Sequence, residues 1–307
     1  MSTPTPAAAR AASPGRGIAL ALTAFAMFTV MDTGVKALGA AWHVAQVMAV
    51  NSAVAVVLVT AIAAARGGIG RLGTRQLRLH LLRWAISFVG TIAVFSSYPK
   101  VPLADAYGVL FTMPLFLTAL SVPLLKEPVG WRRWTAVAVG FLGVLVMLQP
   151  GGHPTSPWLF ATLFGAVCHA LNMILIRKLG SHDAPESVAF WGNLLTAIAC
   201  GLVLPWLGTW PSPTEALIGL GIGTIAGTAF LMLVTAYQQA PAGIIAPFQY
   251  SQLLYGTLAG WLVFGEVPGP STLAGAVLIV GSGLYILHRE TVRRRPTVAS
   301  TPARTVP

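Results

Sequence analysis

The chain has 307 residues, of which 55% are hydrophobic and only 9% are charged, and its mean hydropathy is +0.75. A soluble globular domain carries roughly 25% charged residues, so this composition argues against a soluble protein and indicates a polytopic membrane protein. The net charge of +11 is then the topology signal of a membrane protein and does not indicate a nucleic-acid partner.

Residues 1–16 are rich in Pro, Ala and Ser, and residues 289–307 have the same character, so we predict a disordered cytoplasmic tail at each end. The apolar run from residue 17 is too long, and too closely followed by others, for a cleaved signal peptide. Runs of about 20 apolar residues favour helices over barrel strands, which would alternate over roughly 10 residues. We therefore expect an all-α fold of ten membrane helices, with approximate ranges 17–38, 44–65, 79–98, 102–124, 131–149, 157–177, 186–206, 214–237, 241–264 and 270–288.

Lysine and arginine are distributed unevenly between the two sides of this arrangement. With the N-terminus inside, 17 of the 19 Lys and Arg residues fall on the inner side, including Arg83 at the start of the third helix. Only Lys36 and Lys100 fall toward the outer side. Because positive residues accumulate in cytoplasmic segments, we expect both termini to be cytoplasmic and place the chain in a bacterial inner membrane.

The chain resembles itself when it is shifted by about 139 residues, which brings "VPLADAYGVLFTMPLFLTALSVPLLKEPVGW" onto "APAGIIAPFQYSQLLYGTLAGWLVFGEVPGP". Small further shifts align polar residues of the two halves, Asp32 with Asn172 and Asn51 with Asn193. Each half, 17–151 and 152–288, holds five predicted helices. Because five is odd, the halves must have opposite orientations, as in secondary transporters that bind substrate near the membrane midplane between inverted repeats.

The stretch "PLADAYGVLFTMPLFLTALSVPLLKEPVGWRRWTAVAVGFLGVLVMLQPG", residues 102–151, resembles the EamA-domain transporters of the drug/metabolite transporter superfamily. The second copy, through "FGEVPGPSTLAGAVLIVGSGLYIL", extends the resemblance over residues 17–288. It implies a ten-helix inverted-repeat fold and secondary transport of a small organic solute, with export as the expected direction. Uptake of a vitamin or adenosyl compound, of the riboflavin or S-adenosylmethionine type, is the alternative. In one departure, relatives often carry an arginine in the second helix, where this chain has Asn51.

Asp32 and Lys36 lie four residues apart in the first predicted helix and therefore on one face. A charge at the bilayer centre costs about 2.5–3.5 kcal/mol on insertion scales, so such residues usually face a cavity or a partner. For Lys36, an ion pair at the helix end or snorkelling toward the outer side is the alternative. Removal from water favours the neutral form of a carboxyl group, so proton coupling through Asp32 is a hypothesis.

Other polar and aromatic residues within the predicted helices are candidates for contacts with the substrate. Helix–helix hydrogen bonds, or core and lipid packing for the aromatic residues, are the alternative for each. Pro247 frees a backbone carbonyl beside two of them, which predicts a hinge or a substrate contact. With Asp32 and Lys36, the candidates are Asn51, Tyr107, His169, Asn172, Trp191, Asn193, Gln249, Gln252 and Tyr255.

Three glycines spaced by four, Gly219, Gly223 and Gly227, form one face of the eighth predicted helix. Such faces allow close helix packing, with a dimer interface as the alternative, so we expect a monomer or a homodimer. Glu127 and Glu266 each follow a helix end and are expected to cap it or to contact a loop.

The sequence carries no Gly-rich phosphate-binding loop, no HExxH motif and no evident set of catalytic residues. We therefore expect no enzymatic activity, no cofactor and no metal, and the lipid bilayer and a zwitterionic or aromatic solute as partners. A non-transporting scaffold or receptor subunit is the competing class. A polar cavity between the halves would favour a carrier over a scaffold.

Overall fold

The computed structural model describes residues 14–126, 130–148, 156–179, 183–240 and 242–293. Its elements are α1 (Pro14–Leu38), α2 (Val44–Ala65), η1 (Ile69–Leu72), α3 (Leu77–Ser97), η2 (Tyr98–Lys100), α4 (Leu103–Leu110), α5 (Met113–Leu125), α6 (Trp131–Leu148), α7 (Pro157–Leu179), α8 (Pro185–Leu207), α9 (Pro213–Gln239), α10 (Ala242–Ile245), η3 (Ala246–Tyr250), α11 (Ser251–Phe264) and α12 (Pro270–Arg293). Within these ranges every element is a helix, so the chain is an all-α polytopic membrane protein.

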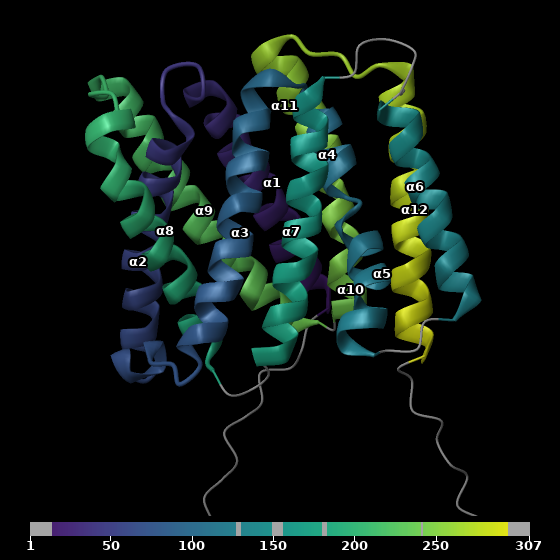
Figure 1. The fold of residues 1–307 in the computed structure, drawn as a ribbon, viewed down its shortest axis with the longest axis horizontal. Coiled ribbons are helices and arrows are strands. Elements are labelled where there is room, and N and C mark those ends of the chain that lie inside the picture. Colours follow the sequence, from purple (N-terminus) through teal and green to yellow (C-terminus); the bar gives the residue numbers. More distant parts are fainter. Residues whose placement is uncertain (1–13, 127–129, 149–155, 180–182, 241, 294–307) are drawn as a thin grey trace, which may run out of the picture.

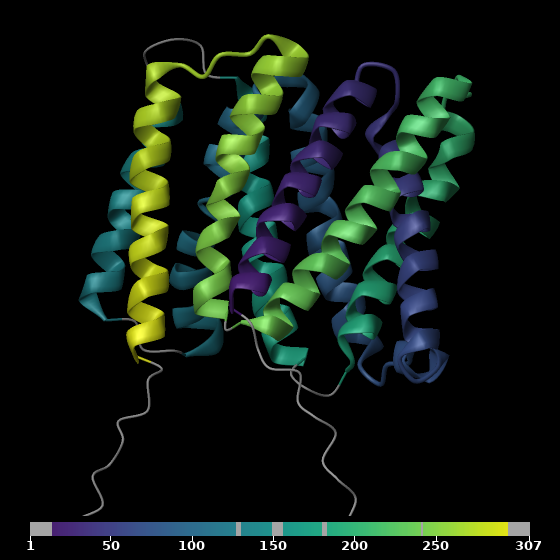
Figure 2. The same cartoon turned by 180° about the vertical axis from the view of Figure 1, so that it is seen from behind.

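The long helices run side by side and form one bundle (Figure 1). The most extensive packing joins α1 to α9, α2 to α8, α3 to α7 and α6 to α12. The first described turn of α1 and the last turn of α12 lie at the same end of the bundle, at the bottom of Figure 2. We call this end the base and the opposite end the top.

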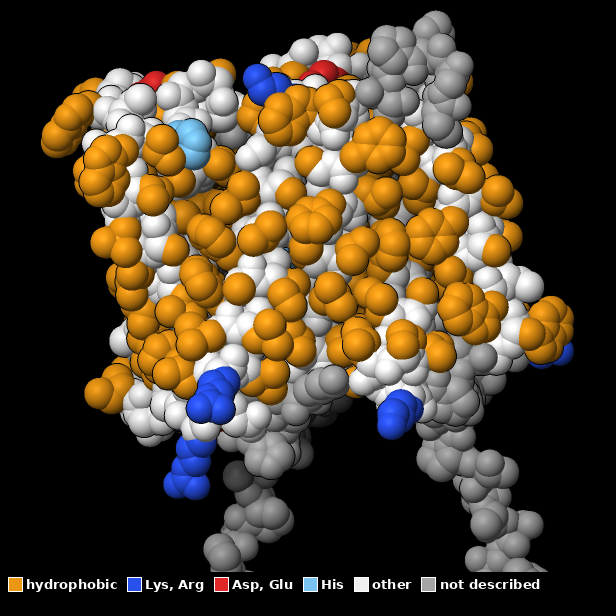
Figure 3. Space-filling view, viewed as in Figure 1, with side chains coloured by type: hydrophobic (Ala, Val, Ile, Leu, Met, Phe, Trp, Pro, Cys, Tyr) orange, Lys and Arg blue, Asp and Glu red, His pale blue; other side chains and the backbone are white. Residues whose placement is uncertain are grey.

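The surface matches a lipid environment. In Figure 3 hydrophobic side chains cover the middle of the visible face, whereas most of its Lys and Arg side chains lie at the base. Within the described residues, nine helices are long and apolar enough to cross a membrane. They coincide with nine of the ten predicted spans, because a run of about 20 apolar residues satisfies its backbone groups in lipid only as a helix.

Two predicted helices are interrupted at prolines. The predicted helix 102–124 divides into α4 and α5 around Phe111 and Thr112, just before Pro114. The predicted helix 241–264 becomes α10, the short 3-10 helix η3 that contains Pro247, and α11. Proline lacks the backbone N–H that would continue the helical ladder, so the interruption expected at Pro247 is present, and Pro114 accompanies a similar break between α4 and α5.

The bounds of the outer helices also differ from the predicted ones. The helix α1 already begins at Pro14, and α12 continues to Arg293, so both enter segments predicted to be disordered. The rest of both predicted tails, 1–13 and 294–307, and Glu127 lie outside the described residues.

The glycine face of α9 brings this helix close to α2 within the chain. A Cβ atom added at Gly219 would collide with the ring of Trp42, and one at Gly223 would lie 2.9 Å from the Val54 side chain. Another at Gly227 would collide with a side chain of α2. The prediction of close helix packing at this face is confirmed, because a larger residue at Gly223 or Gly227 would separate the two helices, and one at Gly219 would displace Trp42, which precedes α2.

Candidate functional site

A cavity of about 600 Å³ lies between α1, α2, α3, α7, α8 and α9. Its walls therefore come from both predicted halves of the chain. The lining includes five aromatic side chains, namely Phe28, Trp84, Phe88, Phe95 and Phe230. Cavities of about 300–1,000 Å³ with apolar walls and a few polar groups are typical of small-molecule sites.

Three of the predicted candidates line this cavity, one each from α2, α7 and α8: Asn51, Asn172 and Asn193. Asn172 is buried, with 8% of its surface exposed. The Asn193 Nδ2 atom donates to the Ala189 carbonyl of its own helix over 2.9 Å. Amides both donate and accept hydrogen bonds, so the cavity offers both kinds of group on three sides.

Arg83 is a cavity residue that is not among the candidates predicted from the sequence. It was counted among the inner-side charges, but it lies in the second turn of α3, is only 6% exposed and lines the cavity. Its Nη2 donates to the Val188 carbonyl over 2.6 Å, and its Nη1 donates to Asn172 Oδ1 over 3.4 Å. The available signal was an arginine followed directly by the uncharged run "WAISFVG".

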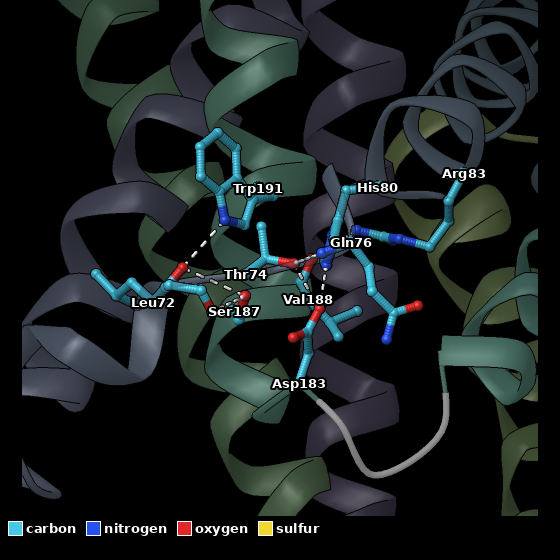
Figure 4. A network of polar contacts seen from close by, with 10 residues as sticks. Leu72, Thr74, Gln76, His80, Arg83, Asp183, Ser187, Val188 and Trp191 are labelled. Atoms are coloured by element: carbon cyan, nitrogen blue, oxygen red, sulfur yellow. Dashed lines mark hydrogen bonds and ion pairs between the residues drawn. The ribbon is translucent and has the colours of Figure 1, made fainter. Parts of the chain in front are cut away.

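A polar cluster at the base lies beside Arg83 (Figure 4). Asp183 is at its centre, because its Oδ2 accepts a hydrogen bond from the Thr74 hydroxyl over 2.7 Å and lies 2.8 Å from Nε2 of the fully buried His80. Nearby, Glu186 pairs with Arg71 over 3.0 Å. We call Arg71, Thr74, His80, Asp183 and Glu186 the base network. It joins the segment after α2 and the start of α3 to the start of α8.

Asp32 is buried in α1 but is not among the residues that line the cavity. Its Oδ2 accepts a hydrogen bond of 2.7 Å from the hydroxyl of Tyr107, which is also buried. Tyr98 interacts with the same carboxylate. Asp32 therefore lies in a closely packed group with two buried tyrosines, Tyr98 and Tyr107.

Lys36 pairs with Glu266 and not with Asp32. The Lys36 Nζ atom lies 2.5 Å from Glu266 Oε1 and donates to the Val101 carbonyl. Leu103 N in turn donates to Glu266 Oε2 over 3.2 Å. The expected loop contact of Glu266 is thereby confirmed, and it connects α1 to the segment after α11 at the top of the bundle.

The remaining candidates do not line this cavity. The Trp191 ring donates through Nε1 to the Leu72 carbonyl over 3.0 Å. Four others are half-buried, His169 on α7, Gln249 in η3, and Gln252 and Tyr255 on α11. The structure therefore separates the predicted residues into the cavity amides, the Asp32 group, the Lys36 pair and these outlying positions.

Comparisons with known proteins agree with this architecture. The EamA-like transporter family matches residues 15–149 and 156–287. The chain is 32% identical to the riboflavin transporter of Vibrio cholerae, over 80% of this chain and 83% of that protein. It is 29% identical to the S-adenosylmethionine uptake transporter of Rickettsia conorii, over 73% of this chain and 76% of that one.

Two further matches cover more of the chain. The pseudopaline exporter of Pseudomonas aeruginosa is 28% identical, over 86% of this chain and 93% of its own length. A crystal structure at 21% identity shares the fold with a TM-score of 0.63, and the match covers 92% of this chain and all of that one, 100%. Since the family matches almost all of the membrane-spanning part in two copies, the chain belongs to the EamA-like transporter family.

Proposed function

We propose that this chain is a secondary transporter that moves a small organic metabolite across the bacterial inner membrane by alternating access. The observation that carries the proposal is the cavity of about 600 Å³, which takes aromatic walls and amides from both halves of the chain. A scaffold would have no need for such a cavity. A binding site between two halves is what a carrier requires.

The pairing of helices supports two equivalent halves, 17–151 and 152–288. If the halves are equivalent, α1 corresponds to α7 and α3 corresponds to α9. The packing of α1 on α9 is then the counterpart of the packing of α7 on α3. The two other main pairs, α2 with α8 and α6 with α12, each join equivalent helices. A contact pattern that is unchanged when the halves are exchanged supports two structurally equivalent halves.

Polar contacts between the two halves occur at both ends of the bundle. At the top, Lys36 pairs with Glu266, and Gln46 exchanges two hydrogen bonds of 2.9 Å with the Thr209 backbone. At the base, the base network joins the segment after α2 to α8. In alternating access one end opens while the other stays closed, so each set of contacts would break in turn.

The direction of transport has two candidates. Export follows from the family resemblance in the sequence, and the similarity to the pseudopaline exporter supports it. Uptake is the second candidate, because the name of the Rickettsia conorii relative specifies uptake. The aromatic walls and amides of the cavity suit a flat solute with hydrogen-bonding groups in either direction.

Reconstituted vesicles test the proposal. The purified chain, inserted in a known orientation, is offered a mixture of metabolites on one side and then on the other, and mass spectrometry measures what crosses. We expect at least one organic solute to cross faster than in protein-free vesicles, and the side from which it crosses gives the direction. If no solute crosses from either side, the proposal is wrong.

A further inference from the structure

We propose that Arg83 forms an anion subsite in the cavity and that the solute therefore carries a carboxylate group. This inference rests on the proposed function and narrows its substrate class. Arg83 is the only Lys or Arg among the residues that line the cavity in the described part of the chain. A single fixed cation matches one singly charged anionic group.

The guanidinium of Arg83 lacks a counterion. It makes no ion pair with any described carboxylate within 4.0 Å, although it is only 6% exposed. Asp183 also lines the cavity, but its Oδ2 is held by Thr74 and His80. A buried cation without an opposite charge nearby is unfavourable, and a solute carboxylate would supply that charge.

The hydrogen bonds of Arg83 leave donors for such a group. Guanidinium carries five N–H donors. One N–H of Nη1 donates to Asn172, and one N–H of Nη2 donates to the Val188 carbonyl. The Nε atom is buried and has no hydrogen-bond partner in the described chain. Carboxylates bind guanidinium through two parallel N–H···O bonds, and the second N–H of each Nη atom offers such a pair.

The surroundings hold Arg83 in place. Acceptors from two helices fix the guanidinium, Asn172 on α7 and the Val188 carbonyl on α8. The helix α8 has a glycine where the guanidinium approaches, and a Cβ atom added at Gly192 would lie 3.2 Å from Nη2. A pre-positioned donor group loses little freedom on binding, so these contacts favour a specific anion site.

Aromatic rings lie next to this group on the same helix. Trp84 and Phe88 both line the cavity, and their ring centroids are 5.2 Å apart. The Trp84 ring is fixed by a hydrogen bond of 3.1 Å from Nε1 to Thr196 Oγ1. A flat solute could therefore stack on this wall while its carboxylate reaches Arg83. The geometry points to an aromatic carboxylate.

Matched acids and amides test the inference by binding alone. The purified full chain in lipid nanodiscs is titrated with indole-3-acetate and indole-3-acetamide, and with nicotinate and nicotinamide, up to millimolar concentration. Protection against thermal unfolding and calorimetry are the readouts. We expect the wild type to bind at least one acid ten-fold or more tightly than its amide, and Arg83→Gln to lose this preference.

Two further variants separate charge recognition from general damage. Arg83→Lys keeps the charge but loses the paired donors, so a reduced preference for the acid should remain. Arg78→Gln changes an exposed arginine on the same helix and should behave as the wild type. If Arg83→Gln does not elute as a folded protein, Arg83→Lys is the deciding variant, and a preference that it leaves undiminished would overturn the inference.

The inference is overturned if acids and amides bind the wild type equally, if no acid binds, or if folded Arg83→Gln retains the preference. These outcomes are distinct from failure of the proposed function. A chain that moves only neutral solutes in vesicles would remain a transporter without an anion subsite. One that binds the acids but moves no solute would keep the subsite and lose the proposed function.

Discussion

The ion pair between Lys36 and Glu266 allows a quantitative test of how the top of the bundle is held closed. Lys36 is 7% exposed and Glu266 is 21% exposed. Removing one member of a fully buried pair costs about 3–5 kcal/mol. Glu266→Gln keeps an acceptor oxygen, and Lys36 keeps its hydrogen bond to Val101. We therefore expect a smaller loss of about 2 kcal/mol, similar to a hydrogen bond to a charged group.

A double variant of Lys36 and Glu266 separates the energy of the ion pair from the other effects of the two substitutions. Lys36→Met alone leaves Glu266, which water can partly reach, so the expected loss is only about 1 kcal/mol. In Lys36→Met/Glu266→Gln no buried ammonium is left without its partner, so the double variant should be more stable than Glu266→Gln alone. The assay is thermal unfolding of the purified protein, in which about 1 kcal/mol corresponds to a shift of roughly 2–4 °C in the midpoint. If the two single losses simply add in the double variant, this account of the pair is refuted.

Further predictions concern packing, the buried carboxylate of α1 and the base network. Gly227→Leu should force α9 away from α2 and lower the free energy of unfolding by about 1–3 kcal/mol. In the control variant Gly221→Ala, the added Cβ atom meets no neighbour within 4 Å, so this free energy should change by no more than about 1 kcal/mol. Thermal unfolding compares the two variants, and equal losses would contradict the packing argument. If Asp32 carries protons during transport, uptake of a known substrate into wild-type vesicles should respond to an imposed pH gradient. Asp32→Asn should not respond to the gradient but should still exchange substrate. An equal response in both proteins would exclude this role. Because Arg71 is 40% exposed, Arg71→Gln should lower the free energy of unfolding by at most about 1 kcal/mol. Asp183→Asn leaves a buried histidine without its carboxylate and should lower it by about 1–3 kcal/mol. The same unfolding assay would refute this ranking if Arg71→Gln were the more damaging change.

Hydropathy and composition are local properties, so the sequence alone predicted most of the framework. Nine of the ten expected spans coincide with long apolar helices in the described chain, because lipid leaves an apolar segment few alternatives to a helix. The resemblance to EamA-domain transporters, drawn from residues 102–151, agrees with the family match in two copies. The glycine spacing in α9 predicted close packing, since the absence of a side chain matters wherever two helices touch.

Tertiary structure decided which polar residues meet. Asn51, Asn172 and Asn193 converge because three separate helices are packed with those faces inward, and Lys36 pairs with Glu266 from a distant segment. Arg83 lies in the cavity wall, whereas the sequence placed it only near the inner end of a helix. The rotation of each helix about its axis follows from its packing partners. A charge pattern read along the chain therefore locates a residue near an end of a span but does not show whether it faces water, lipid or a cavity.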